Sequence, residues 1–225
     1  CAEYVRLAIA KKCNILKLAP TASDFEEAAE LIQLASGNGV KYVTACSSRF
    51  AQPFVVMKNY LTEVGIEKIY FINAFCNLQQ NDIPKSSGMG VLLNACFELI
   101  DALVLNFSLP QQLYALLTNR APDKKQRQYL PEESAAINMH FAGGLVANFV
   151  AATSTSAESW SLAVHGRETN ITVRSNKFRV YDNENHLLQE RRFSKSEPEI
   201  ELLNDFAQSI ICPDEYKPRY ESSAD

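Results

Sequence analysis

The sequence predicts a doubly wound α/β domain with a parallel sheet, followed by an α+β domain on an open, mostly antiparallel sheet with helices on one face. Two observations predict this order. Residues 1–76 alternate helix, strand, helix, strand, helix and strand, which is typical of a parallel sheet covered by helices. Residues 77–212 contain one long helical pattern, then short strands separated by turn residues, then a final helix.

In the first 76 residues, helices are expected over 2–12, from about 23 to 36 and over 53–64, and strands over 14–18, 40–45 and 69–75. Ser23, with Glu26 three positions later, is expected to cap the second helix. Gly37-Asn38-Gly39 ends that helix. The side of this helix expected to face inward is apolar and consists of Phe25, Ala28, Ala29, Ile32 and Ala35. The strands are apolar on both faces, as a parallel sheet requires.

The second part has a helical pattern over Gly88–Leu105 and extended patterns after Pro110. Ala142-Gly143-Gly144 predicts a hairpin between two strands. The strands expected from this point on are Ala135–Phe141, Leu145–Ala152, Ser161–His165, Asn170–Arg174, Phe178–Tyr181 and His186–Phe193. The last helix, Glu199–Ile211, is expected to bury one face formed by Ile200, Leu203, Phe206 and Ile210.

The composition suits a globular protein with an ample core, since 47% of the 225 residues are hydrophobic. The net charge of -4 gives no electrostatic reason to expect nucleic acid or a membrane as partner. The six cysteines include no C-x-x-C pair and are interpreted as reduced thiols of a cytoplasmic protein. With three scattered histidines, no metal site is expected.

Four segments, in the same order, resemble the glucose-fructose oxidoreductase / inositol dehydrogenase / MocA family of NAD(P)-dependent sugar and polyol dehydrogenases. The first segment is similar to the family's "H-A-E … H-V-L-C-E-K-P" and runs from Ala2-Glu3-Tyr4 through Asn14–Pro20. Gly88–Asp101 is similar to "G-G-G-x-L-x-D-x-G-x-H-x-x-D", and Ser159–Gly166 is similar to the "W-x-L-x-V-x-G" strand. The remaining segment runs from Glu26-Glu27-Ala28 through Gly39-Val40-Lys41 to Arg49-Phe50-Ala51-Gln52-Pro53.

The resemblance implies that residues 1–76 are the second half of a Rossmann NAD(P)-binding domain, and that 77–225 are a substrate and oligomerisation domain without its final helix. The sequence has no G-x-G-x-x-G after a strand. The first half of the domain, with this phosphate loop, is therefore expected in about 70–100 residues before Cys1. The resemblance further implies NAD or NADP as cofactor, a sugar-like or polyol substrate, and a homo-oligomer formed through the open sheet.

The catalytic positions that the resemblance implies carry other residues here. Ala19 stands where the family has the lysine of E-K-P, and Glu98 stands where it has a histidine. Lys17 lies two residues before Ala19, about 7 Å away on the same strand face. It is either a displaced catalytic group or an exposed lysine at the end of the strand.

Asn94, Glu98 and Asp101 share one helix face by their spacing. A desolvated Glu98 can act as acid or base, or it can pair with a basic neighbour. Asn94 can orient a hydroxyl, and Asp101 is expected to contact substrate.

Pro20 and Arg49 follow strands at the carboxyl edge of the predicted sheet and are expected to contact the cofactor. Arg49 can alternatively contact the substrate or pair with a carboxylate at its loop. Two functions remain open at this point. One is hydride transfer between NAD(P) and a sugar-like substrate, with Lys17, Glu98 and Asn94 as displaced catalytic groups. The other is a non-catalytic protein that keeps the fold for nucleotide or ligand binding, or as an oligomeric scaffold. Val164, Ile171 and Val173 fit either a dimer face or a face covered by helices.

Overall fold

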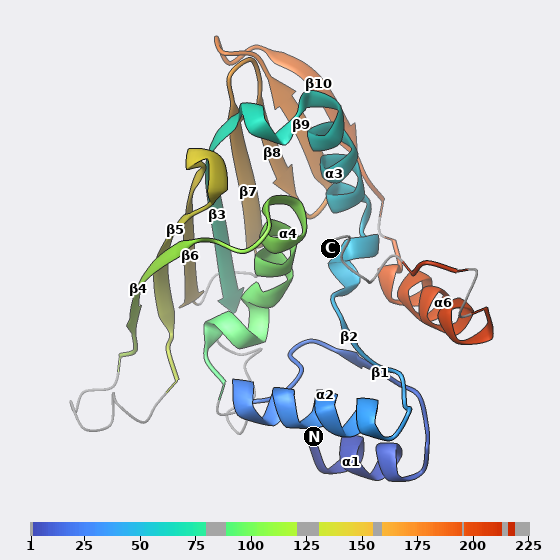
Figure 1. Ribbon diagram of the computed structural model, residues 1–225. Coiled ribbons are helices and arrows are strands. Elements are labelled where there is room, and N and C mark those ends of the chain that lie inside the picture. The colour runs from blue at the N-terminus through green and yellow to red at the C-terminus, as the bar shows by residue number, and fades with distance from the viewer. Residues whose placement is uncertain are drawn as a thin grey trace. The chain divides into compact units, whose positions relative to one another are not determined.

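The computed structural model describes residues 2–79, 89–120, 131–154, 159–194, 196–212 and 216–218 (Figure 1). The chain forms two compact units. The first consists of Cys1–Arg49 and Pro198–Ser222, and the second is formed mainly by Phe50–Glu197. Because the chain returns to the first unit near its end, the last helix belongs with the first fifty residues and not with the strands that precede it.

The first unit contains a two-stranded parallel sheet with helices, as the alternating pattern predicts. Its elements are α1 (Ala2–Ala10), β1 (Ile15–Leu18), α2 (Phe25–Gly37), β2 (Tyr42–Ala45), η1 (Ser47–Phe50), which runs into the second unit, and α6 (Pro198–Ile211). The pairing of β1 with β2 runs in parallel register from Ile15 opposite Tyr42 to Leu18 opposite Ala45. A small core of Val5, Ile9, Leu31, Ala35 and Val40 holds the helices to the strands.

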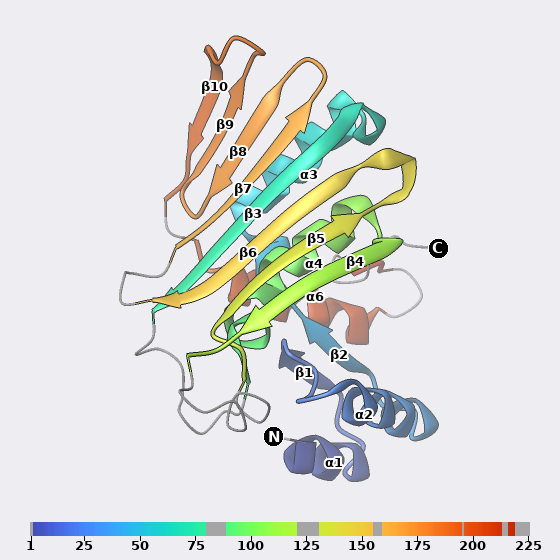
Figure 2. The same ribbon diagram turned by 90° about the vertical axis from the view of Figure 1, so that its left-hand side faces the viewer.

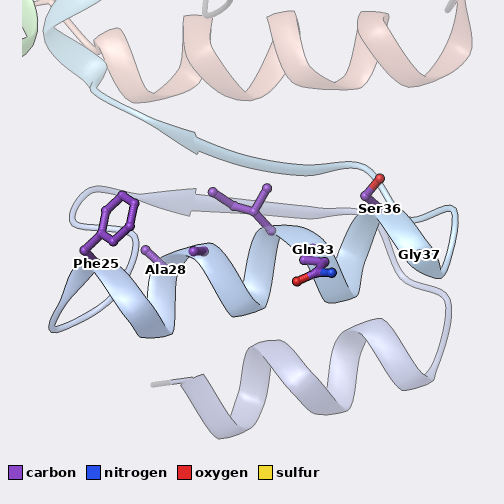
Figure 3. Close-up of a pocket in the computed structure, with 7 residues that line it drawn as sticks. Phe25, Ala28, Gln33, Ser36 and Gly37 are labelled. Atoms are coloured by element: carbon purple, nitrogen blue, oxygen red, sulfur yellow. The ribbon is translucent and has the colours of Figure 1, made fainter.

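The start and the buried face of α2 differ from the prediction. Asp24, not Ser23, is the N-cap, and its carboxylate accepts a hydrogen bond of 2.8 Å from the Glu27 backbone N–H. The Glu27 carboxylate accepts from the Ser23 N–H at 3.2 Å, so the whole arrangement lies one residue later than predicted. The helix buries Leu31 and Ala35. Phe25 is 82% exposed and lies beside an open groove along the helix, as Figure 3 shows.

The buried face of α6 also differs from the prediction. Leu202, Asp205, Phe206 and Ser209 are buried, whereas Ile200 and Leu203 are more than half exposed and Ile210 is exposed too. The polar side chains point inward because partners satisfy them. The Tyr216 hydroxyl donates to Asp205 Oδ1 at 2.5 Å, and the Ser209 hydroxyl donates to the backbone carbonyl of Phe206 at 2.7 Å.

The second unit is an eight-stranded sheet with the order β10-β9-β8-β7-β3-β6-β5-β4. Every neighbouring pair is antiparallel except β3 with β6. The strands are β3 (Ile69–Gln79), β4 (Gln112–Thr118), β5 (Ser134–His140), β6 (Val146–Ser154), β7 (Ser159–Gly166), β8 (Asn170–Arg174), β9 (Lys177–Tyr181) and β10 (Leu187–Arg192). The short helical turns are η2 (Ile66–Lys68) and η5 (Ala142–Gly144), the latter within the hairpin predicted between β5 and β6.

Helices cover one face of this sheet and leave the other open, as predicted. They are α3 (Gln52–Val64), the π-helix η4 (Leu92–Cys96) and α4 (Phe97–Phe107). Figure 2 shows α3 and α4 behind the sheet. Val164, Ile171 and Val173 are buried in the core that also contains Met57 and Leu61 of α3. Of the two alternatives left open for these residues, the structure therefore supports the face covered by helices.

The third predicted strand, Ile69–Phe75, belongs to this sheet and not to the parallel sheet of the first unit. β3 lies between β6 and β7, and it pairs in parallel with β6 from Phe71 to Gln79. An apolar strand pattern shows that a segment is buried but does not identify its partner strand, which explains the difference. The assignment of residues 1–76 as one cofactor domain remains a prediction.

A polar cluster fixes the start of the helix that follows β3. Glu132 Oε1 accepts a hydrogen bond of 3.0 Å from the Leu92 N–H, and the Glu132 backbone carbonyl accepts one from the Val91 N–H at 3.0 Å. The Glu132 carboxylate lies so close to Gly90 that it occupies the space of a Cβ atom there. Gly90 is therefore required by the close approach of Glu132.

Replacing Asp24 by alanine is expected to lower the free energy of unfolding by about 0.5–2 kcal/mol, because the Glu27 N–H loses its cap. Ser23→Ala is the matched control and should change it by less than about 0.5 kcal/mol. Urea denaturation of both variants makes the measurement. A larger loss for Ser23→Ala than for Asp24→Ala would restore the originally predicted cap.

Gly90→Ala is expected to lower the free energy of unfolding by about 1–3 kcal/mol, because the new methyl group displaces the Glu132 carboxylate and leaves the Leu92 N–H without its acceptor. In a Glu132→Ala background the same change should cost much less, so a double-mutant cycle measures the coupling directly. An equal cost of Gly90→Ala in both backgrounds would contradict the proposed contact.

Candidate functional site

The first group of candidate residues lies in the first unit, near the carboxyl ends of β1 and β2. Because these strands are parallel and Leu18 lies opposite Ala45, the residues after each strand emerge at the same edge of the sheet. Lys17 belongs to β1 and Pro20 follows it, whereas Ser48 and Arg49 follow β2. The carboxyl edge of such a sheet is where ligands bind in doubly wound folds.

The Lys17 ammonium group is held by its own loop. Lys17 Nζ donates a hydrogen bond to the backbone carbonyl of Pro20. It also donates to the backbone carbonyl of Leu18, at 3.5 Å. Burial lowers the pKa of Lys17 below its usual value, and the Glu27 carboxylate partly offsets this effect. The structure thus brings Lys17 and Pro20 together, and a lysine with a lowered pKa gives up its proton more readily than a fully solvated one.

Ser48 is a residue that the sequence prediction did not single out. Ser48 is only 3% exposed. Within the described residues, its Oγ atom has no hydrogen-bond partner. A buried hydroxyl without a partner is uncommon, because its desolvation is not compensated. Ser48 precedes Arg49 in η1, where the Arg49 N–H donates to the Cys46 carbonyl at 3.3 Å. The Ser48 hydroxyl is therefore suited to a polar ligand at this edge.

The second group lies in the second unit, on η4 and α4, which follow Gly90. Asn94 belongs to the π-helix η4, whereas Glu98 and Asp101 belong to α4. All three side chains are partly buried. A π turn advances the chain by a different angle from an α turn, so the simple α-helical spacing assumed for Asn94 and Glu98 does not hold across the junction.

The Asn94 side chain is bonded to the start of its own helix. Its Nδ2 atom donates to the carbonyl of Met89 at 2.6 Å and to that of Gly90 at 2.9 Å. Its Oδ1 atom is therefore the atom of this amide suited to accept a hydrogen bond from a ligand hydroxyl. Asn94 and Glu132 together hold the segment from Met89 to Leu92, so Glu132 acts on this site as a positioning residue.

Glu132 and Gly90 carry different sequence signals. Gly90 lies in the Gly-x-Gly segment that resembles the family motif, so a close backbone approach could have been expected there. The contact of Glu132 with a helix 40 residues earlier has no local signal. Lys17, Pro20 and Arg49 belong to one unit and Asn94, Glu98 and Asp101 to the other.

Other chemistries find less support in the described residues. A hydrogen bond with Cys76, together with burial, raises the pKa of the Cys96 thiol, which makes it a poor nucleophile. Within the described ranges, no group of three His, Cys, Asp or Glu side chains could hold a metal ion. No helix in the described part of the chain has the length and apolar character needed to cross a membrane.

Comparisons with solved structures show that this chain shares its fold with a group of oxidoreductases. No protein-family model matches the sequence, and no curated protein matches it either. Among solved structures, UDP-N-acetylglucosamine 3-dehydrogenase from Acidithiobacillus ferrooxidans is similar with a TM-score of 0.75 and 16% identity. The alignment covers 98% of this chain and 69% of that protein.

Two further solved structures were determined with ligands. Biliverdin reductase from Synechocystis, in complex with biliverdin and NADP+, is similar with a TM-score of 0.76 and 14% identity. That alignment covers 96% of this chain and 69% of the reductase. An oxidoreductase from Agrobacterium radiobacter, in complex with NAD+, L-tartaric acid and magnesium, is similar with a TM-score of 0.73 and 12% identity. The alignment with it covers 96% of this chain and 68% of that protein. The fold of this chain is therefore that of oxidoreductases of the glucose-fructose oxidoreductase / inositol dehydrogenase / MocA type, as its sequence segments suggested.

Proposed function

We propose that this protein is an NAD(P)-dependent oxidoreductase that transfers a hydride between the nicotinamide and a sugar-like or polyol substrate. The fold shared with oxidoreductases supports a nicotinamide cofactor in general. The observation that carries the proposal furthest is the buried hydroxyl of Ser48 at the carboxyl edge of β1 and β2, for which the described part of the chain offers no hydrogen-bond partner. A hydroxyl in this position is suited to a hydrogen bond with a polar group of a ligand.

The residues at this edge fit part of a dinucleotide. When bound, the cofactor would supply the hydride chemistry. Ser48 and Arg49 would hold polar groups of the cofactor, and Pro20 would line the same edge between Lys17 and α2. The sequence has no G-x-G-x-x-G after a strand, so no residue of this chain is assigned to the pyrophosphate.

Oxidation of an alcohol also requires a group that accepts the hydroxyl proton. In this proposal Glu98 is the proton acceptor, since its carboxylate stands where the family has a histidine. Asn94 orients the substrate hydroxyl through Oδ1, because its Nδ2 atom is bonded to Met89 and Gly90. Asp101 binds the substrate one turn further along α4. Lys17 is the second candidate for proton transfer, supported by its lowered pKa.

A non-catalytic scaffold is the second candidate function. It is favoured by Ala19, which has neither a proton nor a charge to offer at the lysine position. In that case the protein would bind a nucleotide or ligand without turnover, or assemble as a homo-oligomer through the open sheet. The two central strands, β3 and β6, carry the exposed Phe75 and Val146, which fits such a contact.

Ser48→Ala is expected to weaken NAD(H) or NADP(H) binding by about three- to tenfold, the worth of one hydrogen bond. It should not lower the stability of the free protein, because it removes a buried hydroxyl that has no partner. Calorimetric titration and urea denaturation of the full-length protein provide both readouts. Ser47→Ala is the control, since Ser47 is buried and has an interaction of its own. Unchanged cofactor affinity with lost stability would contradict this role of Ser48.

Glu98→Gln is expected to reduce turnover of a sugar or polyol by about 10²–10⁴-fold while leaving cofactor binding intact, because a carboxamide cannot take up the hydroxyl proton. The pH dependence of kcat should lose the limb that belongs to the base. Glu63→Gln on α3 is the control, an exposed carboxylate that should leave turnover unchanged. Turnover of Glu98→Gln equal to that of the parent across the pH range would exclude Glu98 as the base. Cofactor binding without turnover of any polyol or sugar by the parent protein would favour the scaffold.

A further inference from the structure

The hydrogen bonds of the Lys17 side chain match a neutral amine better than an ammonium group. Nζ donates to two backbone carbonyls, those of Pro20 and Leu18. In the described part of the chain it has no further acceptor and no carboxylate at ion-pair distance. An ammonium group has three N–H donors, whereas a neutral amine has two and a lone pair. Because both N–H bonds of the neutral amine point at these carbonyls, its lone pair points away from them.

Burial acts in the same direction as this hydrogen bonding. Lys17 is half-buried near the end of β1, and burial is the main cause that lowers its pKa. At pH 7 only about one ordinary lysine in a few thousand is neutral. Since the neutral amine is the nucleophile, a lowered pKa makes Lys17 more reactive at neutral pH.

Two titratable side chains of neighbouring elements affect Lys17 differently. The Glu27 carboxylate of α2 favours the ammonium form, but its own hydrogen bonds come from the N–H and Oγ of Ser23, at 3.2 and 3.4 Å. Tyr42 of β2 lies on the same face of the parallel pair as Lys17 by register. Burial raises the pKa of the Tyr42 hydroxyl, so Tyr42 is uncharged at neutral pH and adds no negative charge beside Lys17.

Lys12 provides a comparison within the same unit. Its Nζ also donates to two oxygens, the backbone carbonyl and Oδ1 of Asn38, at 2.8 and 3.1 Å. Lys12 is exposed, however, so water accepts its third N–H. Lys12 therefore has as many protein acceptors as Lys17 but lacks the burial that favours a neutral amine.

We propose that Lys17 is an imine-forming lysine that takes an aldehyde as its ligand at the carboxyl edge of β1 and β2. The lone pair of the neutral Nζ attacks the carbonyl carbon, and a C–N bond forms. The carbonyl oxygen then leaves as water together with the two amine protons, and a C=N double bond remains. The step needs no oxidant or reductant, because carbon and nitrogen keep their oxidation states.

This role is separate from the proton transfer considered for Lys17 above, because Nζ forms a covalent bond with carbon. Imine formation requires neither the nicotinamide cofactor nor turnover. A failure of the proposed oxidoreductase function therefore leaves it unaffected, and the two can be tested independently.

Reductive trapping on the full-length protein measures the reactivity of Lys17. Glyceraldehyde is the probe, cyanoborohydride reduces each imine to a stable secondary amine, and peptide mass spectrometry gives the labelled fraction of every lysine. At pH 7 we expect Lys17 to carry more label than Lys12 and more than Lys41, a half-buried lysine of the same unit. The excess should shrink towards about pH 10–11, where ordinary lysines are neutral as well.

Glu27→Gln separates the effect of charge from that of hydrogen bonding. The new amide oxygen can still accept from Ser23, whereas the negative charge that favours the ammonium form is lost. The label on Lys17 at pH 7 should rise, by up to about fivefold, the range of one charge interaction near a surface. Glu26→Gln is the matched control, because it removes the same charge from an exposed position of α2 and should leave the label unchanged.

Lys17→Arg confirms the assignment of the labelled peptide, since arginine stays protonated and can still donate to the two carbonyls. The label at position 17 should be lost while that on Lys12 and Lys41 is retained. Labelling of Lys17 no faster than that of Lys12 and Lys41 in the parent protein at pH 7 would overturn the proposal. Label on Lys17 that does not rise after Glu27→Gln, or that rises equally after Glu26→Gln, would overturn it too.

Discussion

The second unit depends on the pairing of β3 at the centre of its sheet. This strand of eleven residues runs parallel to β6 on one side and antiparallel to β7 on the other, and thereby joins two groups of strands that are otherwise separate. One of its faces contributes Ile72, Ala74 and Cys76 to the core. Because η4 contacts β3, the position of the helix that carries Asn94 and Glu98 depends on this strand as well.

The order and type of the elements could be predicted from the sequence because they are encoded locally. Strands β5 to β10 follow the alternation and turn residues seen in the sequence, and the hairpin at residues 142–144 forms where its glycines predict it. Partner choice is not local, and there the prediction was wrong. β3 was assigned to the parallel sheet of the first unit because its apolar residues fit either sheet equally well.

Burial on α6 shows the same limit in a different way. A count of apolar residues favours the face with Ile200 and Leu203, yet the structure buries Asp205 and Ser209 instead. The polar groups are accepted in the interior because Tyr216 donates to Asp205 and the Ser209 hydroxyl donates to the Phe206 carbonyl. Similarly, the position of Asn94 was recognised by resemblance, but the hydrogen bonds of its amide depend on a π turn that has no local signature. The missing partner of Ser48 is a tertiary property that no sequence pattern carries.

Hydrogen bonds connect the end of β4, through residues 132 and 133, to the helix that carries Asn94 and Glu98. At the end of β4, the Thr118 carbonyl accepts from the Glu133 N–H at 2.9 Å, and the Arg120 N–H donates to the Glu133 carboxylate at 2.8 Å. The adjacent residue, Glu132, holds the start of the helix through the N–H groups of Val91 and Leu92. These few hydrogen bonds hold the start of the helix on which the positions of Asn94 and Glu98 depend.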